Sequence, residues 1–262
     1  MIDPSSAPHD SALGKRAGTI QSVSTAARFL TILANAEEPL ALGVLARRAG
    51  TGSSTAHRYM QSLIKDGLAT QDEASGLYDL GPLALSIGIA ALKRINPVEI
   101  AARHMKDLAD RIAASAGVAI WTERGPTLVR WYRSAYFSIS SLGLGDILPL
   151  DNTACGLVFQ AFLTPGRVDI ARRQQPDHFR GTPPSTDMLA MIRANCMAEL
   201  TGHLLPQIRG QAVPVFDAQQ EIACVMTTVS NLGQTPSQSD RDALFDTARS
   251  VAHETGGTAA FG

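Results

Sequence analysis

The spacing of hydrophobic residues in the first 80 positions predicts three short helices followed by a hairpin. Apolar residues recur at helical intervals in three stretches, 23–33, 42–49 and 53–65. Gly50 and Gly67 follow the second and third stretches and are expected to end them. Residues 68–71 and 77–80 predict two short strands around a turn. Three helices and a hairpin, with about four residues between the second and third helices, are typical of a winged helix-turn-helix.

The remaining pattern predicts a linker helix and a second, α+β domain. In the stretch 82–93 apolar residues cover most of the helix circumference, so we expect this linker to pack against another subunit. Asn96-Pro97 breaks it. Beyond it we predict helices at 98–115, 153–163, 187–200 and 239–255, and strands at 118–122, 127–132, 138–142, 211–216 and 222–230, with a firm turn at 164–166. The expected division is a flexible tail 1–19, a winged helix-turn-helix 20–81, a linker helix 82–97 and a second domain 98–262.

The composition is that of an ordinary globular protein in a reducing compartment. Hydrophobic residues make up 45% and charged residues 18% of the 262 positions. The three cysteines form no CxxC pair, which argues against a disulfide framework and a zinc site. The first 16 residues lack the pattern of a secretory signal, and no run approaches the roughly 20 apolar residues of a membrane span. We therefore expect a cytoplasmic protein without cofactor, metal or membrane partner.

Positive charge is concentrated in one segment of the chain. The net charge of −1 offers no general attraction to nucleic acid. Between Pro39 and Lys65, however, there are four positive side chains and no acidic one, which predicts that the third helix enters the major groove of DNA. The expected DNA-binding residues are Arg47, Ser53, Ser54, Thr55, His57, Arg58 and Lys65, with Arg58 and Ser54 as first candidates for base contacts. The alternatives are a small domain with one basic helix, an exposed His57, and a capping or packing role for Thr55.

Several segments resemble the IclR family of bacterial transcriptional regulators, in the order in which that family has them. They are Ile20-Gln21-Ser22-Val23, Pro39-Leu40, and the stretches 45–50, 54–58, 76–81, 145–156 and 212–217. The resemblance covers nearly the whole chain after residue 19. Departures are Thr25, where Arg is common in the family, Gly52-Ser53, where Pro-Lys is frequent, and Asp151, where His is common. They predict altered DNA contacts and an altered effector.

The resemblance implies a transcriptional regulator with a GAF-like effector-binding domain and a palindromic double-stranded DNA operator. It also implies homodimers that pair into homotetramers, and control of a catabolic operon. Matched to family pockets, the effector-binding residues are Phe137, Ser140, Leu142, Ala154, Cys155, Leu200, Ile208, Gly210, Thr227 and Val229. To these we add Trp121, from an aromatic group that includes Trp131, Tyr132, Tyr136 and Phe137 and that could equally be sheet core.

The predicted helix at 153–163 suggests the chemistry of the effector. The N–H groups of Thr153, Ala154 and Cys155 lack intrahelical partners, so with the helix dipole they can hold a carboxylate. Arg130 or Arg133 could pair with the same carboxylate, although either could simply be exposed. We therefore favour a small aromatic or otherwise apolar carboxylic acid.

Two other functions compete with this hypothesis. A hydrolase could use Cys155, whose pKa a helix N-terminus would lower, with His178 or His203 as base. Because triad-like spacing, a metal motif and a Gly-rich phosphate loop are all missing, we expect a pocket residue and no enzyme. The other alternative is a DNA-binding protein that takes no ligand.

Overall fold

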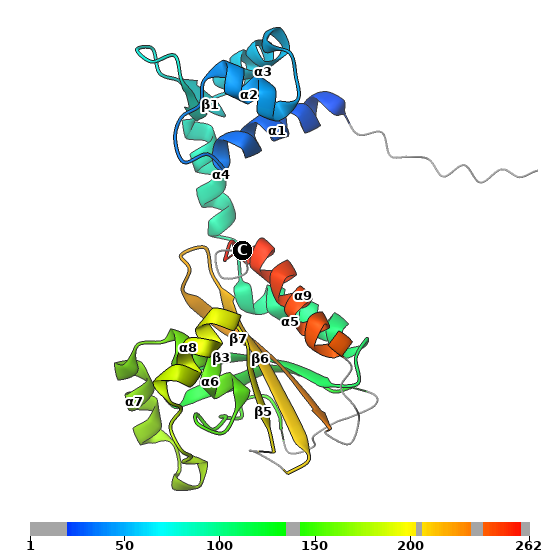
Figure 1. Ribbon diagram of the computed structural model, residues 1–262, viewed down its shortest axis with the longest axis vertical. Coiled ribbons are helices and arrows are strands. Elements are labelled where there is room, and N and C mark those ends of the chain that lie inside the picture. Colours follow the sequence, from blue (N-terminus) through cyan, green and yellow to red (C-terminus); the bar gives the residue numbers. More distant parts are fainter. Residues whose placement is uncertain (1–19, 135–141, 203–205, 232–237, 258–262) are drawn as a thin grey trace, which may run out of the picture. The chain divides into compact units, whose positions relative to one another are not determined.

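The computed structural model describes residues 20–134, 142–202, 206–231 and 238–257. It divides the chain into two compact units, 1–94 and 95–262, each with its own elements (Figure 1). Among the described residues no helix combines the length and the apolar character needed to span a bilayer. The fold class is the expected one, a winged helix-turn-helix followed by an antiparallel-sheet domain with helices.

The first unit is built on three helices: α1 (Gln21–Ala34), α2 (Leu42–Ala49) and α3 (Ser53–Lys65). Their inward side chains form one core, centred on Phe29, Leu45 and Met60. Gly50 ends α2 with a φ of +65°, a left-handed conformation that costs glycine little. The N–H of Thr51 then donates to the carbonyl of Ala46 at 2.9 Å. This tight turn sets the angle at which α3 leaves α2.

A hairpin and a fourth helix complete the first unit. Strands β1 (Ala69–Gln71) and β2 (Tyr78–Leu80) pair antiparallel and form the wing. In the turn between them Asp72 accepts bonds from the N–H and the hydroxyl of Ser75, which lower the pKa of its carboxyl. Helix α4 (Pro82–Leu92) follows, and its large apolar residues are all at least two-fifths exposed.

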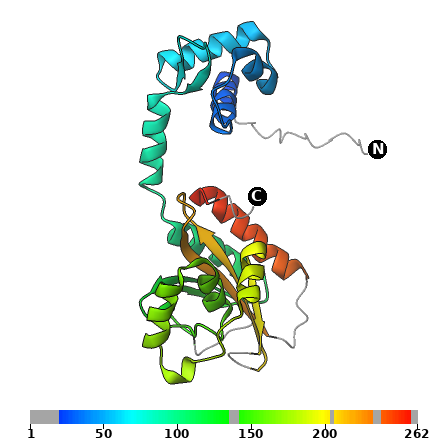
Figure 2. The same ribbon diagram turned by 60° about the vertical axis from the view of Figure 1, so that its left-hand side comes forward.

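The second unit is a five-stranded antiparallel sheet between two layers of helices (Figures 1 and 2). The strands are β3 (Ser115–Thr122), β4 (Gly125–Tyr132), β5 (Ala198–Thr201), β6 (Ile208–Phe216) and β7 (Ile222–Asn231), in the order β4-β3-β7-β6-β5. Helices α5 (Pro97–Ala109) and α9 (Gln238–Thr255) cover one face around a core with Met105, Met226 and Leu244. On the other face, α6 (Ala154–Phe162) and α8 (Thr186–Asn195) share a second core with Phe159.

The structure differs from the sequence-based expectation at several element boundaries. The predicted helix 187–200 is α8 followed by β5, because Cys196 takes a left-handed φ of +47° that ends the helix. The predicted turn at 164–166 is the start of α7 (Pro165–Gln174), in which Pro165 occupies the first turn. The predicted helix 98–115 ends at Ala109, and β3 begins at Ser115. Most of the predicted strand 138–142 lies outside the described residues.

Candidate DNA-binding surface and effector cavity

Helix α3 presents a polar, basic face on the outside of the first unit. Ala56, Met60 and Leu63 are buried at helical spacing and attach α3 to the core. The opposite side is exposed and carries Ser54, His57, Arg58, Gln61 and Lys65, with Ser53 at the start of the helix. Thr55 is half-buried between the two sides. The inward residues thus determine which side chains α3 offers to a partner.

This face is free of compensating charge. Arg47, Arg58 and Lys65 form no salt bridge with any residue that the structure describes. The N-cap of α3 is Gly52, which has no side chain to cap the helix. Within the described part of the chain, the N–H groups of Ser53 and Ser54 consequently have no protein acceptor. Free cations and free N–H groups are the donors that phosphates accept from.

Arg28 is a contributor to this region that the sequence pattern did not reveal. It lies on α1, and its Nη1 donates to the carbonyl of Ala49 at 3.0 Å. Ala49 is the last residue of α2, where carbonyls lack intrahelical partners and the helix dipole is negative. Arg28 therefore ties α1 to the turn before α3.

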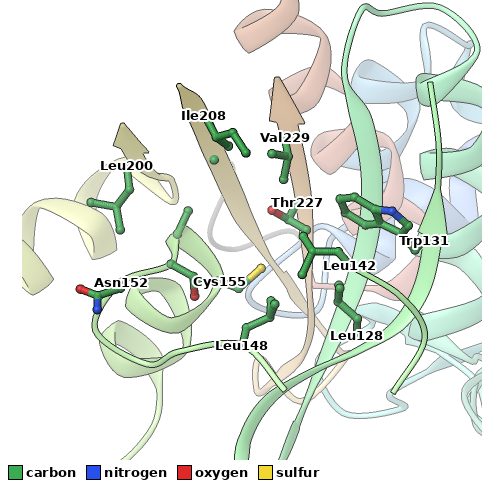
Figure 3. A pocket seen from close by; sticks show the side chains of 13 residues that line it. Leu128, Trp131, Leu142, Leu148, Asn152, Cys155, Leu200, Ile208, Thr227 and Val229 are labelled. Carbon is green, nitrogen blue, oxygen red and sulfur yellow. The ribbon is translucent and has the colours of Figure 1, made fainter. Parts of the chain in front are cut away.

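The second unit contains a cavity between the sheet and the start of α6 (Figure 3). Eight predicted effector-binding residues line it: Leu142, Ala154, Cys155, Leu200, Ile208, Gly210, Thr227 and Val229. The remaining lining residues are Leu128, Trp131, Leu148, Asn152 and Thr153, which the predicted list did not contain. Trp131 was within reach of sequence reasoning as one of only two tryptophans, whereas Leu128 and Leu148 carry no signal beyond being apolar. The cavity has a volume of about 50 Å³, the space of one or two water molecules.

Of the other three predicted pocket residues, only Trp121 belongs to the described part of the chain, and it is not among the lining residues. Trp121 lies near the β3–β4 hairpin, with its ring 5.4 Å from the ring of Phe159, and packs against the α6 core. Phe137 and Ser140 fall outside the described residues. Tyr132 packs toward the α5–α9 core, so the proposed aromatic group is divided between the two faces of the sheet.

The start of α6 is capped by a side chain. Thr153 is the N-cap, and its Oγ1 accepts from the N–H of Gly156 at 3.0 Å and donates to the carbonyl of Pro149 at 2.7 Å. Within α6 itself, Ala154 and Cys155 are the first residues whose N–H groups lack an intrahelical partner. The hydroxyl of Thr227 is engaged by the carbonyl of Gln211 at 2.7 Å. The cavity is therefore apolar with a small polar edge at α6.

The two arginines suggested as partners of a carboxylate, and the family departure Asp151, are engaged elsewhere or exposed. Arg130 bonds to Glu99 of α5, on the opposite side of the sheet from α6. Arg133 is exposed. Asp151 is buried and accepts from Nη2 of Arg172 at 3.0 Å, so its side chain is not among those that line the cavity.

The proposed nucleophile does not fit its surroundings. Burial raises the pKa of the Cys155 thiol to about 12 and outweighs any lowering by the helix N-terminus. At neutral pH Cys155 is a small apolar wall residue. No three His, Cys, Asp or Glu side chains of the described chain converge as metal ligands.

A winged helix-turn-helix followed by a domain with a mostly apolar cavity is typical of one class of protein, the ligand-responsive transcriptional regulators. The chain belongs to the IclR family within this class. The family's helix-turn-helix domain matches residues 22–73, and its "Bacterial transcriptional regulator IclR C-terminal" domain matches residues 89–254. Its members are regulators of transcription and not enzymes.

Individual relatives agree with this assignment. The chain is 33% identical over 149 residues to the glycerol operon regulatory protein of Streptomyces coelicolor, a match that spans 56% of this chain and only 58% of that protein. It is 26% identical over 255 residues to the DNA-binding transcriptional repressor YiaJ of Escherichia coli, across 91% and 89% of the two chains. The crystal structure of Pseudomonas aeruginosa HmgR superposes with a TM-score of 0.80 at 30% identity, covering 90% of this chain and 98% of that one.

Proposed function

We propose that this protein is a sequence-specific regulator of transcription that binds a palindromic operator as a homodimer or homotetramer. The observation that carries the proposal is the exposed face of α3. Its cations form no salt bridge with any described residue, and no acidic residue lies between Pro39 and Lys65. In this assignment Ser54 and Arg58 contact base edges, while Arg47 and Lys65 contact phosphates. Ser53, Thr55 and His57 complete the interface near the start of α3.

Duplex DNA selected from a random-sequence pool by the full-length protein tests this assignment. Binding of the selected duplex is then measured over a salt series for wild type, Arg58→Ala and Arg167→Ala. Arg167 is an exposed residue of α7 in the second unit, so its variant has the same charge change away from α3. We expect Arg58→Ala to lose roughly 5- to 150-fold in affinity and to relax selection at one base position, as for a base-reading arginine.

The outcomes separate the possible roles of Arg58. A uniform loss over all sequences, with a salt slope smaller by about one, would make Arg58 a phosphate contact. Equal behaviour of Arg58→Ala and Arg167→Ala would show that α3 does not read DNA. Failure of wild type to enrich any duplex would refute the function as a whole.

We further propose that an apolar, preferably aromatic, carboxylic acid controls this activity from the cavity of the second unit. The apolar walls favour a hydrophobic body, and the N–H groups of Ala154 and Cys155 favour an anion at one edge. Since such an acid is larger than the 50 Å³ cavity, we propose that its binding moves side chains of the wall. A binding event that changes the protein's shape is what coupling to DNA affinity requires.

Thermal-shift screening addresses this part of the proposal. The panel contains benzoate and phenylacetate, with hexanoate as an aliphatic acid and glycerol as a small polar comparison. A hit must both stabilise the protein and alter its affinity for the selected duplex. Stabilisation by glycerol alone would contradict the proposed ligand class, and a panel without any hit would favour a regulator that takes none of these acids.

A further inference from the structure

One side of the cavity is formed by a short segment, residues 148–153, which we call the wall loop. Leu148, Asn152 and Thr153 of this loop line the cavity, and Thr153 leads directly into α6. A loop is a mobile element unless its backbone groups have fixed partners. The partners of the wall loop therefore determine how well this side of the cavity is held in place.

The principal partner is Gln175, which follows α7 and is 6% exposed. Its Oε1 accepts from the N–H of Leu150 at 3.1 Å. Its Nε2 donates to the carbonyl of Leu148 at 2.9 Å and to the carbonyl of Arg124, in the β3–β4 turn, at 3.2 Å. One buried amide thus joins α7, the wall loop and the hairpin.

The neighbouring backbone supports this arrangement. A Cβ on Gly125 would lie 2.8 Å from Nε2 of Gln175, and Gly125 also has a φ of +102°, so only glycine leaves space for the amide. Nε2 of Gln160, on α6, donates to the carbonyl of Leu150 at 2.8 Å. The N–H of Leu148 donates to the carbonyl of Pro126 at 2.8 Å. The backbone groups of Leu148 and Leu150 are therefore fully satisfied in one conformation.

The geometry points to Gln175 as a positioning residue for effector binding: it does not touch the cavity but holds the loop that shapes it. This inference rests on the proposed effector function. Removing the amide leaves two buried backbone groups of the loop, the N–H of Leu150 and the carbonyl of Leu148, without this partner, which favours conformations in which the loop reaches water. The loop that contributes Leu148, Asn152 and Thr153 then loses its fixed position. Ordering the loop on binding costs free energy and weakens the affinity for a ligand.

The test compares Gln175→Leu with two controls. Gln174→Leu makes the same substitution on the adjacent, exposed residue of α7. Val251→Ala removes buried atoms of α9 in the core on the other face of the sheet and so lowers stability away from the loop. Hydrogen exchange of the Leu150 amide and affinity for phenylacetate are measured on the full-length proteins.

We expect Gln175→Leu to speed exchange of the Leu150 amide at least tenfold and to weaken phenylacetate binding at least tenfold. Val251→Ala should keep the wild-type affinity, because global destabilisation alone does not move the loop. Unchanged affinity in Gln175→Leu, or an equal loss in Val251→Ala, would overturn the positioning role. If wild type binds no phenylacetate, the assignment of this ligand class fails instead, and exchange at Leu150 still decides whether Gln175 orders the loop.

Discussion

The thiol of Cys155 is subject to two opposing influences. Its place in the first turn of α6 favours the thiolate, whereas burial at 2% exposure favours the neutral thiol. Burial prevails and brings the pKa to about 12, so at pH 8 roughly one thiol in ten thousand is ionised. The same cause raises the pKa of Cys196 and, to about 12, that of Cys224.

We therefore predict that none of the three thiols reacts with Ellman's reagent in the native protein at pH 8. All three should react after unfolding in guanidinium chloride, which serves as the control. Rapid native reaction that Cys155→Ser abolishes would mean that the start of α6 opens to solvent.

The ion pair between Asp151 and Arg172 should respond asymmetrically to the loss of either partner. Asp151 is almost fully buried, while the Arg172 side chain is about a quarter exposed and also contacts Asp169. Arg172→Met leaves a buried carboxylate without its cation and should cost about 3 kcal/mol. Asp151→Asn keeps the shape and a hydrogen-bond acceptor, so it should cost about 1 kcal/mol.

Urea unfolding followed by tryptophan fluorescence measures this difference in the free energy of unfolding of the second unit. Trp121 and Trp131 are the chain's two tryptophans, and both lie in the second unit. Arg173→Met, an exposed neighbour, should change stability little. Equal losses in Arg172→Met and Asp151→Asn would indicate that the carboxylate is solvated when alone.

At the scale of elements, the start of α4 is joined to the end of α3 by a close backbone contact. The N–H of Gly81 donates to the carbonyl of Leu68, and that of Leu83 to the carbonyl of Gly67, each at 2.9 Å. A Cβ on Gly81 would lie 2.3 Å from the carbonyl oxygen of Gly67. The end of α3 and the start of α4 are thereby joined without room for a side chain.

Gly81→Ala should therefore destabilise the first unit by about 2 kcal/mol or more, because backbone carbonyls cannot yield cheaply. Gly43→Ala is the matched control: it lies in α2 with no atom within 4 Å of the new Cβ, and should stabilise by about 0.5–1 kcal/mol. Hydrogen exchange of the α3 amides reports both changes. A change in stability of the same sign in both variants would contradict the close contact at Gly81.

The sequence predicted helices and strands correctly where their hydrophobic residues lie on one face, the face that packs against the core. The repeat Ala56, Met60, Leu63 predicts α3 with its bounds, since only a helix buries residues at that spacing. Helix α7 was not predicted, because most of its residues are charged or polar. It also begins with Pro165-Gly166, a pair that is typical of a turn. Strand β5 was not predicted, because its four residues form a strand only by pairing with β6, and the local sequence pattern does not show this pairing.

At the scale of the whole molecule, the exposed apolar side chains of α4 predict association. Leu83, Leu85, Ile87, Ile89 and Leu92 are 42–65% exposed, an apolar surface that a soluble chain usually covers by association. We predict that wild type sediments as a dimer or larger and that Leu85→Glu weakens this association at least tenfold. Met191→Glu on α8 is the control, since Met191 is also 65% exposed. Equal sedimentation of wild type and Leu85→Glu would exclude α4 from the interface.

The sequence by itself determined the two-part organisation, the basic face of α3 and most of the cavity wall. These features depend on local periodicity, on a stretch of 27 residues without an acidic side chain, and on segments collinear with a family. Tertiary structure alone decided the state of Cys155, the packing of Trp121, the ion pair of Asp151, and the hydrogen-bond partners of Arg28 and Gln175. The reason is physical: burial, hydrogen-bond partners and ion pairs arise between residues far apart in the chain, and Gln175 meets the carbonyl of Arg124 across 51 positions.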